Sequence, residues 1–123
     1  MNNEVKKVFA EAVRLKKQGE LLAAKEMLVS LAASSPHSVA VFAVLGDVYM
    51  EMGLLGEAIS AFRSAVRLAP KLEGVSLALF HCLWKLNRRD EALEEVKRFM
   101  SVSDSVDYRE IINELNQKCG NPS

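Results

Sequence analysis

The sequence has little of what secreted, disordered or membrane-spanning chains are rich in. It holds only two cysteines, Cys82 and Cys119, too few for a disulfide framework and not in a CxxC spacing. The sequence has only three prolines, and 50% of its residues are hydrophobic, a composition that argues against a disordered chain. No apolar run reaches the roughly 18 residues of a membrane span, and the N-terminus lacks a signal-peptide core. We expect a cytoplasmic protein with reduced thiols and no membrane insertion.

The chain also lacks net charge. The 16 Lys and Arg balance the 16 Asp and Glu, for a formal net charge of +0. A balanced chain has no overall attraction to nucleic acid or to an anionic surface. The basic pairs at 6–7, 16–17 and 88–89 have acidic residues nearby, as on solvated helix faces. We therefore expect no nucleic-acid partner.

The sequence contains no motif in which side chains are spaced as in a known type of reaction centre. Neither of the two histidines, His37 and His81, lies at a metal-binding interval from a pair of Cys or carboxylate residues. His81 and Cys82 are adjacent, which on a helix turns them about 100° apart and argues against a dyad. The GxxG at 53–56 lacks the strand and the Lys-Ser/Thr of a phosphate loop. We expect no enzyme, with no catalytic residue, metal or cofactor.

What the chain does contain is an internal repeat. Gly19, Gly53 and Asn87 follow one another at intervals of 34 residues (53 − 19 = 34, 87 − 53 = 34). Three further columns keep the same interval: Ala24, Ala58 and Ala92; Leu28, Phe62 and Val96; Pro36, Pro70 and Asp104. A period of this length is typical of a helix-turn-helix solenoid.

The middle repeat, 39–72, shows two helical patterns. Its first half has an i, i+3, i+4, i+7 face made of Phe42, Leu45, Gly46 and Tyr49. Its second half repeats that spacing with Ala58, Phe62 and Ala65. The small residues predict a close approach of the two helices. Gly53 between them predicts a left-handed cap, and Pro70 ends the second helix.

With these residues, together with the Glu57-Ala58-Ile59 run, the middle repeat resembles a tetratricopeptide repeat. The unit at 5–38 is a degenerate copy, because Val8 stands where an aromatic residue is usual and Glu11 where a leucine is usual. The unit at 73–106 has Phe80 where a small residue is usual and Ser76 where an aromatic residue is usual. The resemblance implies an all-α single domain over 1–123, with antiparallel helical hairpins stacked as a short right-handed solenoid.

About seven helices are expected, near 3–18, 20–34, 38–52, 55–69, 72–86, 89–102 and 105–118. The last helix has Asp104 or Ser105 as a plausible cap. Its apolar side is made of Tyr108, Ile111, Ile112 and Leu115. It is therefore interpreted as a capping helix that covers the last hydrophobic face of the array, followed by a frayed tail at 119–123.

The resemblance also implies a concave groove lined by the first helix of each repeat. Carried through the interval of 34, the residues facing it are Phe9, Val13, Lys16, Ala43, Asp47, Met50, Leu77, His81 and Trp84. Many relatives hold the C-terminal carboxylate of a chaperone peptide with Lys, Asn and Arg in these columns. Here Val13 and Asp47 occupy the Asn positions, and Asp47 would repel a carboxylate, so that carboxylate clamp is disfavoured.

A groove with Met, Trp and Phe side chains suits an apolar peptide or an amphipathic helix of another protein. The sequence thus favours a non-catalytic protein-binding module. An adaptor, or a chaperone similar to small bacterial secretion chaperones of this family, is one form of it by analogy. The alternative is a homodimer, a structural homo-oligomer or an assembly subunit, whose groove is occupied by its own chain or by another copy.

Overall fold

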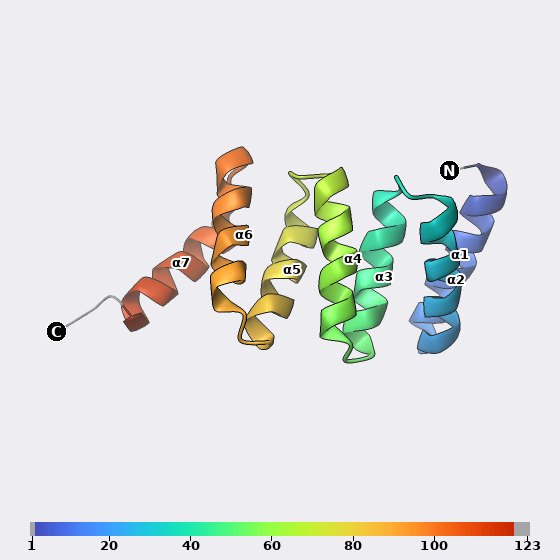
Figure 1. Ribbon diagram of the computed structural model, residues 1–123, viewed down its shortest axis with the longest axis horizontal. Coiled ribbons are helices and arrows are strands. Elements are labelled where there is room, and N and C mark those ends of the chain that lie inside the picture. The colour runs from blue at the N-terminus through green and yellow to red at the C-terminus, as the bar shows by residue number, and fades with distance from the viewer. Residues whose placement is uncertain (1, 120–123) are drawn as a thin grey trace.

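The computed structural model describes residues 2–119, and within them the chain is helical without a strand (Figure 1). The helices are α1 (Asn3–Lys17), α2 (Leu21–Ser34), α3 (Val39–Glu51), α4 (Leu55–Leu68), α5 (Glu73–Lys85), α6 (Arg89–Val102) and α7 (Val106–Cys119). The all-α prediction is confirmed, and each boundary lies within one residue of the expected one. Of the tail expected at 119–123, all but Cys119 lies outside the described residues.

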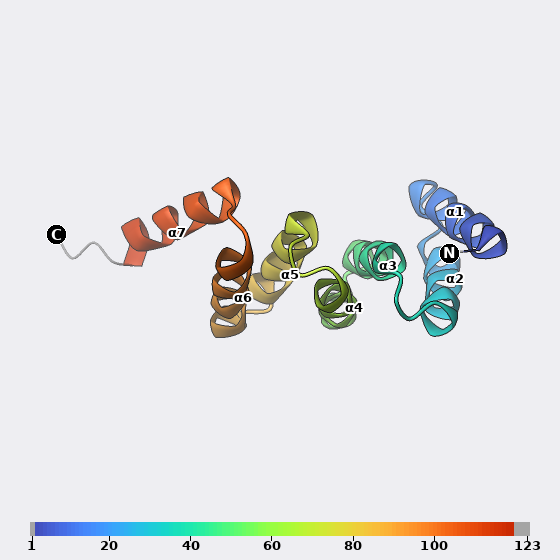
Figure 2. The same ribbon diagram turned by 90° about the horizontal axis from the view of Figure 1, so that it is seen from above.

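The helices form three hairpins, α1–α2, α3–α4 and α5–α6, that follow one another in chain order, with α7 at the far end (Figure 1). Seen from above, the first helices α1, α3 and α5 lie along one edge of the array and the second helices along the other (Figure 2). On the first-helix edge, α3 is recessed between α1 and α5, so this edge is concave.

The three hairpins turn in the same way. Gly19, Gly53 and Asn87 have φ angles of 81°, 78° and 60°, the left-handed conformation that ends a helix. After each, an N–H donates to a carbonyl five residues back: Glu20 to Leu15, Leu54 to Tyr49, and Arg88 to Leu83. The left-handed cap predicted at Gly53 is confirmed, and asparagine serves in the third hairpin because it tolerates this conformation.

Close packing of α3 on α4 occurs at Gly46. A Cβ atom built there would lie within 3.0 Å of three atoms of the Phe62 ring, so no larger residue fits without displacing it. In the third hairpin the sizes are inverted, because Phe80 takes the position of Gly46 and Val96 that of Phe62. Phe80 and Val96 are both buried in one hydrophobic cluster, so the volume lost on α6 is regained on α5.

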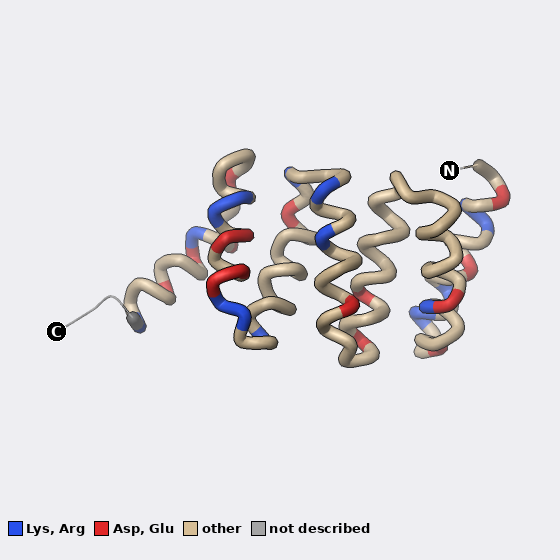
Figure 3. The backbone as a smooth tube through the Cα atoms, in the orientation of Figure 1, with Lys and Arg blue, Asp and Glu red and all other residues tan. Residues whose placement is uncertain are grey.

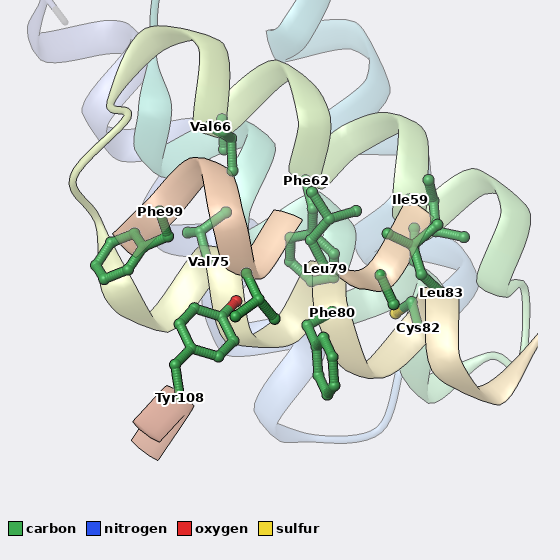
Figure 4. Packing of buried hydrophobic residues seen from close by; sticks show 14 residues of the cluster. Ile59, Phe62, Val66, Val75, Leu79, Phe80, Cys82, Leu83, Phe99 and Tyr108 are labelled. Carbon is green, nitrogen blue, oxygen red and sulfur yellow. The ribbon is translucent and has the colours of Figure 1, made fainter. Parts of the chain in front are cut away.

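Tyr108 anchors α7 on the last hairpin. Its side chain is 0% exposed, with its ring centroid 5.9 Å from that of Phe80 and 5.6 Å from that of Phe99. Figure 4 shows the Tyr108 ring among the side chains of this cluster, near Val75. Ser105 begins the helix by accepting a hydrogen bond from the Tyr108 amide at 3.1 Å, which confirms one of the two expected caps.

The Tyr108 hydroxyl begins a buried polar chain across three helices. It donates to Ser76 Oγ at 2.7 Å, because the Ser76 hydroxyl itself donates to Glu95 Oε2 at 2.5 Å. Arg98 donates to both Glu95 oxygens, at 2.6 and 2.8 Å, and to the Pro70 carbonyl at 2.9 Å. Ser76 at an aromatic position is thereby explained, since it leaves room for the Tyr108 ring and satisfies its hydroxyl.

Replacing Gly46 by alanine should test the α3–α4 contact. We expect Gly46→Ala to lower the free energy of unfolding by about 1 to 3 kcal/mol, because the added methyl group displaces the Phe62 ring. Gly56→Ala is the matched control, since a Cβ atom there meets nothing within 4 Å. Urea unfolding followed by circular dichroism measures both, and equal stability of the two variants would contradict the packing.

Tyr108→Phe should change how stability depends on alkaline pH. Burial is the main cause that raises the pKa of Tyr108 from its ordinary 10.0 to about 12. Because the folded-state pKa of Tyr108 is raised, the protonated hydroxyl stabilises the folded protein. This contribution is complete below the unfolded-state pKa and is lost as pH rises through the folded-state pKa. We expect the wild type to lose on the order of 2 kcal/mol between pH 10 and 12 through this group.

The phenylalanine variant lacks this titration, so its stability should fall less over the same pH range. At neutral pH it should be less stable by about 1 kcal/mol, because one buried hydrogen bond is lost. Urea unfolding at neutral and alkaline pH measures both effects, and parallel curves for the two proteins would contradict them.

Candidate functional site

The nine residues predicted for the groove lie three each on α1, α3 and α5. None of them is fully buried, whereas neighbours such as Ala12, Gly46 and Leu83 on the same helices are. The spacing explains the difference, because the two sets lie on different faces of each helix. These nine residues, called the first-helix face below, lie on the three helices that line the concave edge in Figure 2.

Half-buried apolar side chains make up most of the first-helix face. Phe9 packs against the hydrophobic cluster of the first hairpin. Ala43, Met50, Leu77 and Trp84 pack against the cluster of the later hairpins. These residues thus rest on the core and still present part of their surface to solvent.

An ion pair crosses this face between α1 and α3. Lys16 Nζ lies 3.1 Å from Glu51 Oε1, with the Lys16 side chain 23% exposed. Lys16 was predicted to lie in the groove, but its contact with Glu51 was not predicted. The pair holds the Lys16 ammonium group beside α3 and gives the N-terminal half of the face a polar border.

Asp47 has an unusual environment for a residue that is open to solvent. Burial by the surrounding protein is the main cause that raises its pKa, with Glu51 adding to the shift and Lys16 opposing it. A side chain that reaches solvent and yet has a pKa raised by burial fits a position in a concave surface. The carboxylate is held where its charge is unfavourable, a feature that is enriched at functional sites.

Cys82, next to His81, is not a reactive thiol. Its residue is 1% exposed, and burial is the main cause that raises its pKa, with Asp47 adding to the shift. A nucleophilic cysteine needs a lowered pKa and access to solvent. Cys82 is therefore a core residue.

The C-terminal part of the first-helix face opens into a cleft of about 420 Å³ beneath α7. It is lined by Phe80, His81, Trp84, Arg89, Ile111, Glu114, Leu115 and Lys118. Trp84 stacks on Phe80 at 5.6 Å and 23°, and the Arg89 guanidinium lies 4.9 Å from the indole ring centre. These contacts hold the indole in one orientation. We call this hollow the Trp84 cleft.

Six residues of the Trp84 cleft were missed by the sequence prediction: Phe80, Arg89, Ile111, Glu114, Leu115 and Lys118. A signal for three of them was available. Ile111, Leu115 and Lys118 lie 34 residues after Leu77, His81 and Trp84, so the groove columns continue into the capping helix. The capping role assigned to α7 concealed that it also forms a wall of the site.

The described part of the chain offers no group of three or more His, Cys, Asp or Glu side chains placed to hold a metal ion. Among its helices, none is long and apolar enough to span a bilayer. The first-helix face combines apolar surface, the Trp84 ring fixed by its neighbours, and a few isolated charges. These are the features of a surface that binds another molecule.

Comparisons with known proteins agree with this architecture. Residues 39–72 match the model of the tetratricopeptide repeat family. A MamA point mutant has 23% sequence identity and a TM-score of 0.73 over 85% of this chain and 76% of its own. No curated protein sequence matches the chain.

Two similar structures hold peptides. The Yersinia enterocolitica type III secretion chaperone SycD, in complex with a peptide of the translocator YopD, has 14% identity and a TM-score of 0.76 over 95% of this chain and 90% of its own. The first TPR of Spaghetti (RPAP3), bound to an HSP90 peptide, has 14% identity and a TM-score of 0.78 over 95% of this chain and 94% of its own. The likeness establishes the fold, a tetratricopeptide solenoid.

Asp47→Asn should show that the carboxylate opposes folding. Because the pKa of Asp47 is raised, its ionised form lowers stability above the folded-state pKa, and this loss disappears as pH falls below the ordinary 3.8. We expect the asparagine variant to unfold at a higher temperature than the wild type at pH 7 and at the same temperature under acid conditions. A variant that is less stable at pH 7 would mean that attraction to Lys16 outweighs burial.

Proposed function

We propose that this chain, which carries a tetratricopeptide repeat at 39–72 and folds as a solenoid of such units, binds an apolar or amphipathic segment of another protein. The single observation that carries the proposal is the row of half-buried apolar side chains along the first-helix face. Phe9, Val13, Met50, Leu77 and Trp84 expose apolar surface on one concave edge, where a partner segment can exclude water from several of them at once.

Trp84 is the main anchor of this surface. Phe80 and Arg89 already hold its ring, so a partner side chain that enters the Trp84 cleft does not have to order it. Large aromatic side chains in partly enclosed positions contribute a disproportionate share of binding energy. The apolar residues Ile111 and Leu115 of α7 extend the contact beyond the three hairpins.

The charges restrict the chemistry of the partner. Lys16 is engaged by Glu51, and Asp47 stands in the middle of the face, so a carboxylate of the partner meets repulsion there. A partner with apolar anchors and a basic or hydroxyl group opposite Asp47 fits better. An acidic peptide such as the HSP90 peptide SRMEEVD, which the first TPR of Spaghetti (RPAP3) binds, therefore fits this face less well.

In this proposal the chain acts without catalysis and without nucleic acid, as an adaptor or as a chaperone that covers an apolar segment of its client. The mixed charge of the cleft, with Arg89, Lys118 and Glu114, supports selection among amphipathic segments rather than attraction of any one charge.

Selection of peptides from a displayed random library on the immobilised protein tests this proposal. We expect selected peptides to be amphipathic, with apolar anchors and without a required C-terminal acidic group. Their binding should shift the fluorescence emission of Trp84, the only tryptophan in the chain, to shorter wavelength. Trp84→Ala and Val13→Glu should each weaken binding by about tenfold or more, a loss of about 1.4 kcal/mol.

Both variants should unfold within a few degrees of the wild type, because neither residue is fully buried. Val102→Glu, at a 41% exposed apolar position on α6, is the matched control and should bind normally. The proposal would be contradicted if most selected peptides ended in acidic C-termini, or if Trp84→Ala and Val13→Glu both retained binding.

A further inference from the structure

The helix α2 is unusually apolar for its place in the array. It is a second helix on the outer edge (Figure 2), yet only two of its fourteen residues, Lys25 and Glu26, are charged. The equivalent helix α6 has seven charged residues among fourteen, and Figure 3 shows acidic and basic positions along it. A surface helix normally has a polar outer side, and a helix that is apolar all round is normally covered.

The outer side of α2 exposes large apolar residues. Leu22 is 58% exposed and Val29 is 44% exposed, and the seven-residue interval places them on one side of the helix. Ala33 and Glu26 are exposed on the same side, opposite the buried residues Ala24 and Leu31. The α2 stripe, defined as Leu22, Glu26, Val29 and Ala33, is therefore an apolar strip with one charge near its centre.

An apolar cleft of about 340 Å³ lies beside this stripe. Its lining is Val29, Ala32, Phe42, Leu45, Tyr49, Gly56, Glu57, Ser60, Ala61 and Ser64. The corresponding cleft between α4 and α6 is crossed by an ion pair, with Arg63 Nη2 2.6 Å from Glu91 Oε2. Val29 and Glu57 stand 34 residues before Arg63 and Glu91, so valine replaces the arginine and this ion pair is not formed in the first cleft.

We propose that the α2 stripe is the contact between two copies of this chain, which pack α2 antiparallel against α2 about a twofold axis. If the axis passes between positions 25 and 26, Leu22 of one copy faces Val29 of the other at both ends of the contact. In the middle, Lys25 of each copy faces Glu26 of the other. The same arrangement places Leu22 of the second copy next to the apolar cleft that Val29 lines.

The order of the residues favours a second copy over another occupant. A twofold contact requires one patch to be complementary to itself, with each group matched to its partner across the axis. In α2 the two opposite charges are adjacent, and the two exposed large apolar residues lie at equal distances on either side of them. This symmetry has no role in binding an unrelated partner.

The dimer would leave both binding faces free. The α2 stripe is on the second-helix edge, whereas the first-helix face is on the opposite edge (Figure 2). Two faces joined in one particle can engage two segments of one client, which raises the apparent affinity without new contacts. The dimer is independent of the proposed peptide binding, and either can fail without the other.

Molar mass in solution, measured by light scattering after size-exclusion chromatography, tests the dimer. The wild type should have twice the 13.6 kDa mass of the chain. Lys25→Glu and Glu26→Lys should each be monomeric, because like charges then meet twice across the axis. An equal mixture of the two variants should regain the dimer mass as a heterodimer, and the double exchange K25E/E26K should regain it alone.

Two controls separate this contact from others. Val102→Glu, on α6, and Trp84→Ala, on the first-helix face, should both keep the dimer mass. Val29→Asp changes an exposed position on the stripe and should be monomeric even if a charge variant fails to fold. A wild type that is monomeric at every soluble concentration overturns the proposal. So does a dimer that survives the stripe variants, or one that Trp84→Ala abolishes.

Discussion

The close approach of paired helices is the constraint on which the rest of the structure depends. At Gly46 the absence of a side chain lets the Phe62 ring lie against the α3 backbone, and the buried alanines of each second helix allow similar proximity. The third hairpin meets the same constraint with the large residue moved to the first helix, as Phe80, and the small one to the second. That exchange puts an aromatic ring on α5 at the position where α1 has Ala12 and α3 has Gly46.

Phe80 connects the capping helix to the candidate site. Its ring meets Tyr108 on one side of the last hairpin and stacks on Trp84, which faces the cleft. A departure from the repeat pattern therefore serves two purposes, since it holds α7 in place and orients Trp84. Ser76 is the second departure, and it supplies the hydroxyl partner that Tyr108 needs. The distinctive features of this chain thus lie where the third repeat differs from the second.

Periodicity was sufficient to predict the helices and their turns, because these depend on local spacing and on the conformation of Gly53 and its equivalents. The interactions between helices were not predictable in the same way. The Lys16–Glu51 pair, the Arg89–Trp84 contact and the hydrogen bond between Tyr108 and Ser76 each join two different helices, so they depend on helix packing that the spacing along one helix does not give. The Trp84 cleft was missed because the interval of 34 was not followed into α7.

The mode of attachment of α7 has a consequence for the order in which the molecule opens. Helix α7 lies at the C-terminal end of the array, where Tyr108 and the nearby Ile111 and Ile112 attach it to the hydrophobic cluster of the last hairpin (Figure 1). Its amide hydrogens therefore exchange with solvent through a smaller opening than global unfolding requires. Since α7 is one wall of the Trp84 cleft, each such opening also removes that wall, and any molecule held in the cleft slows the exchange of α7.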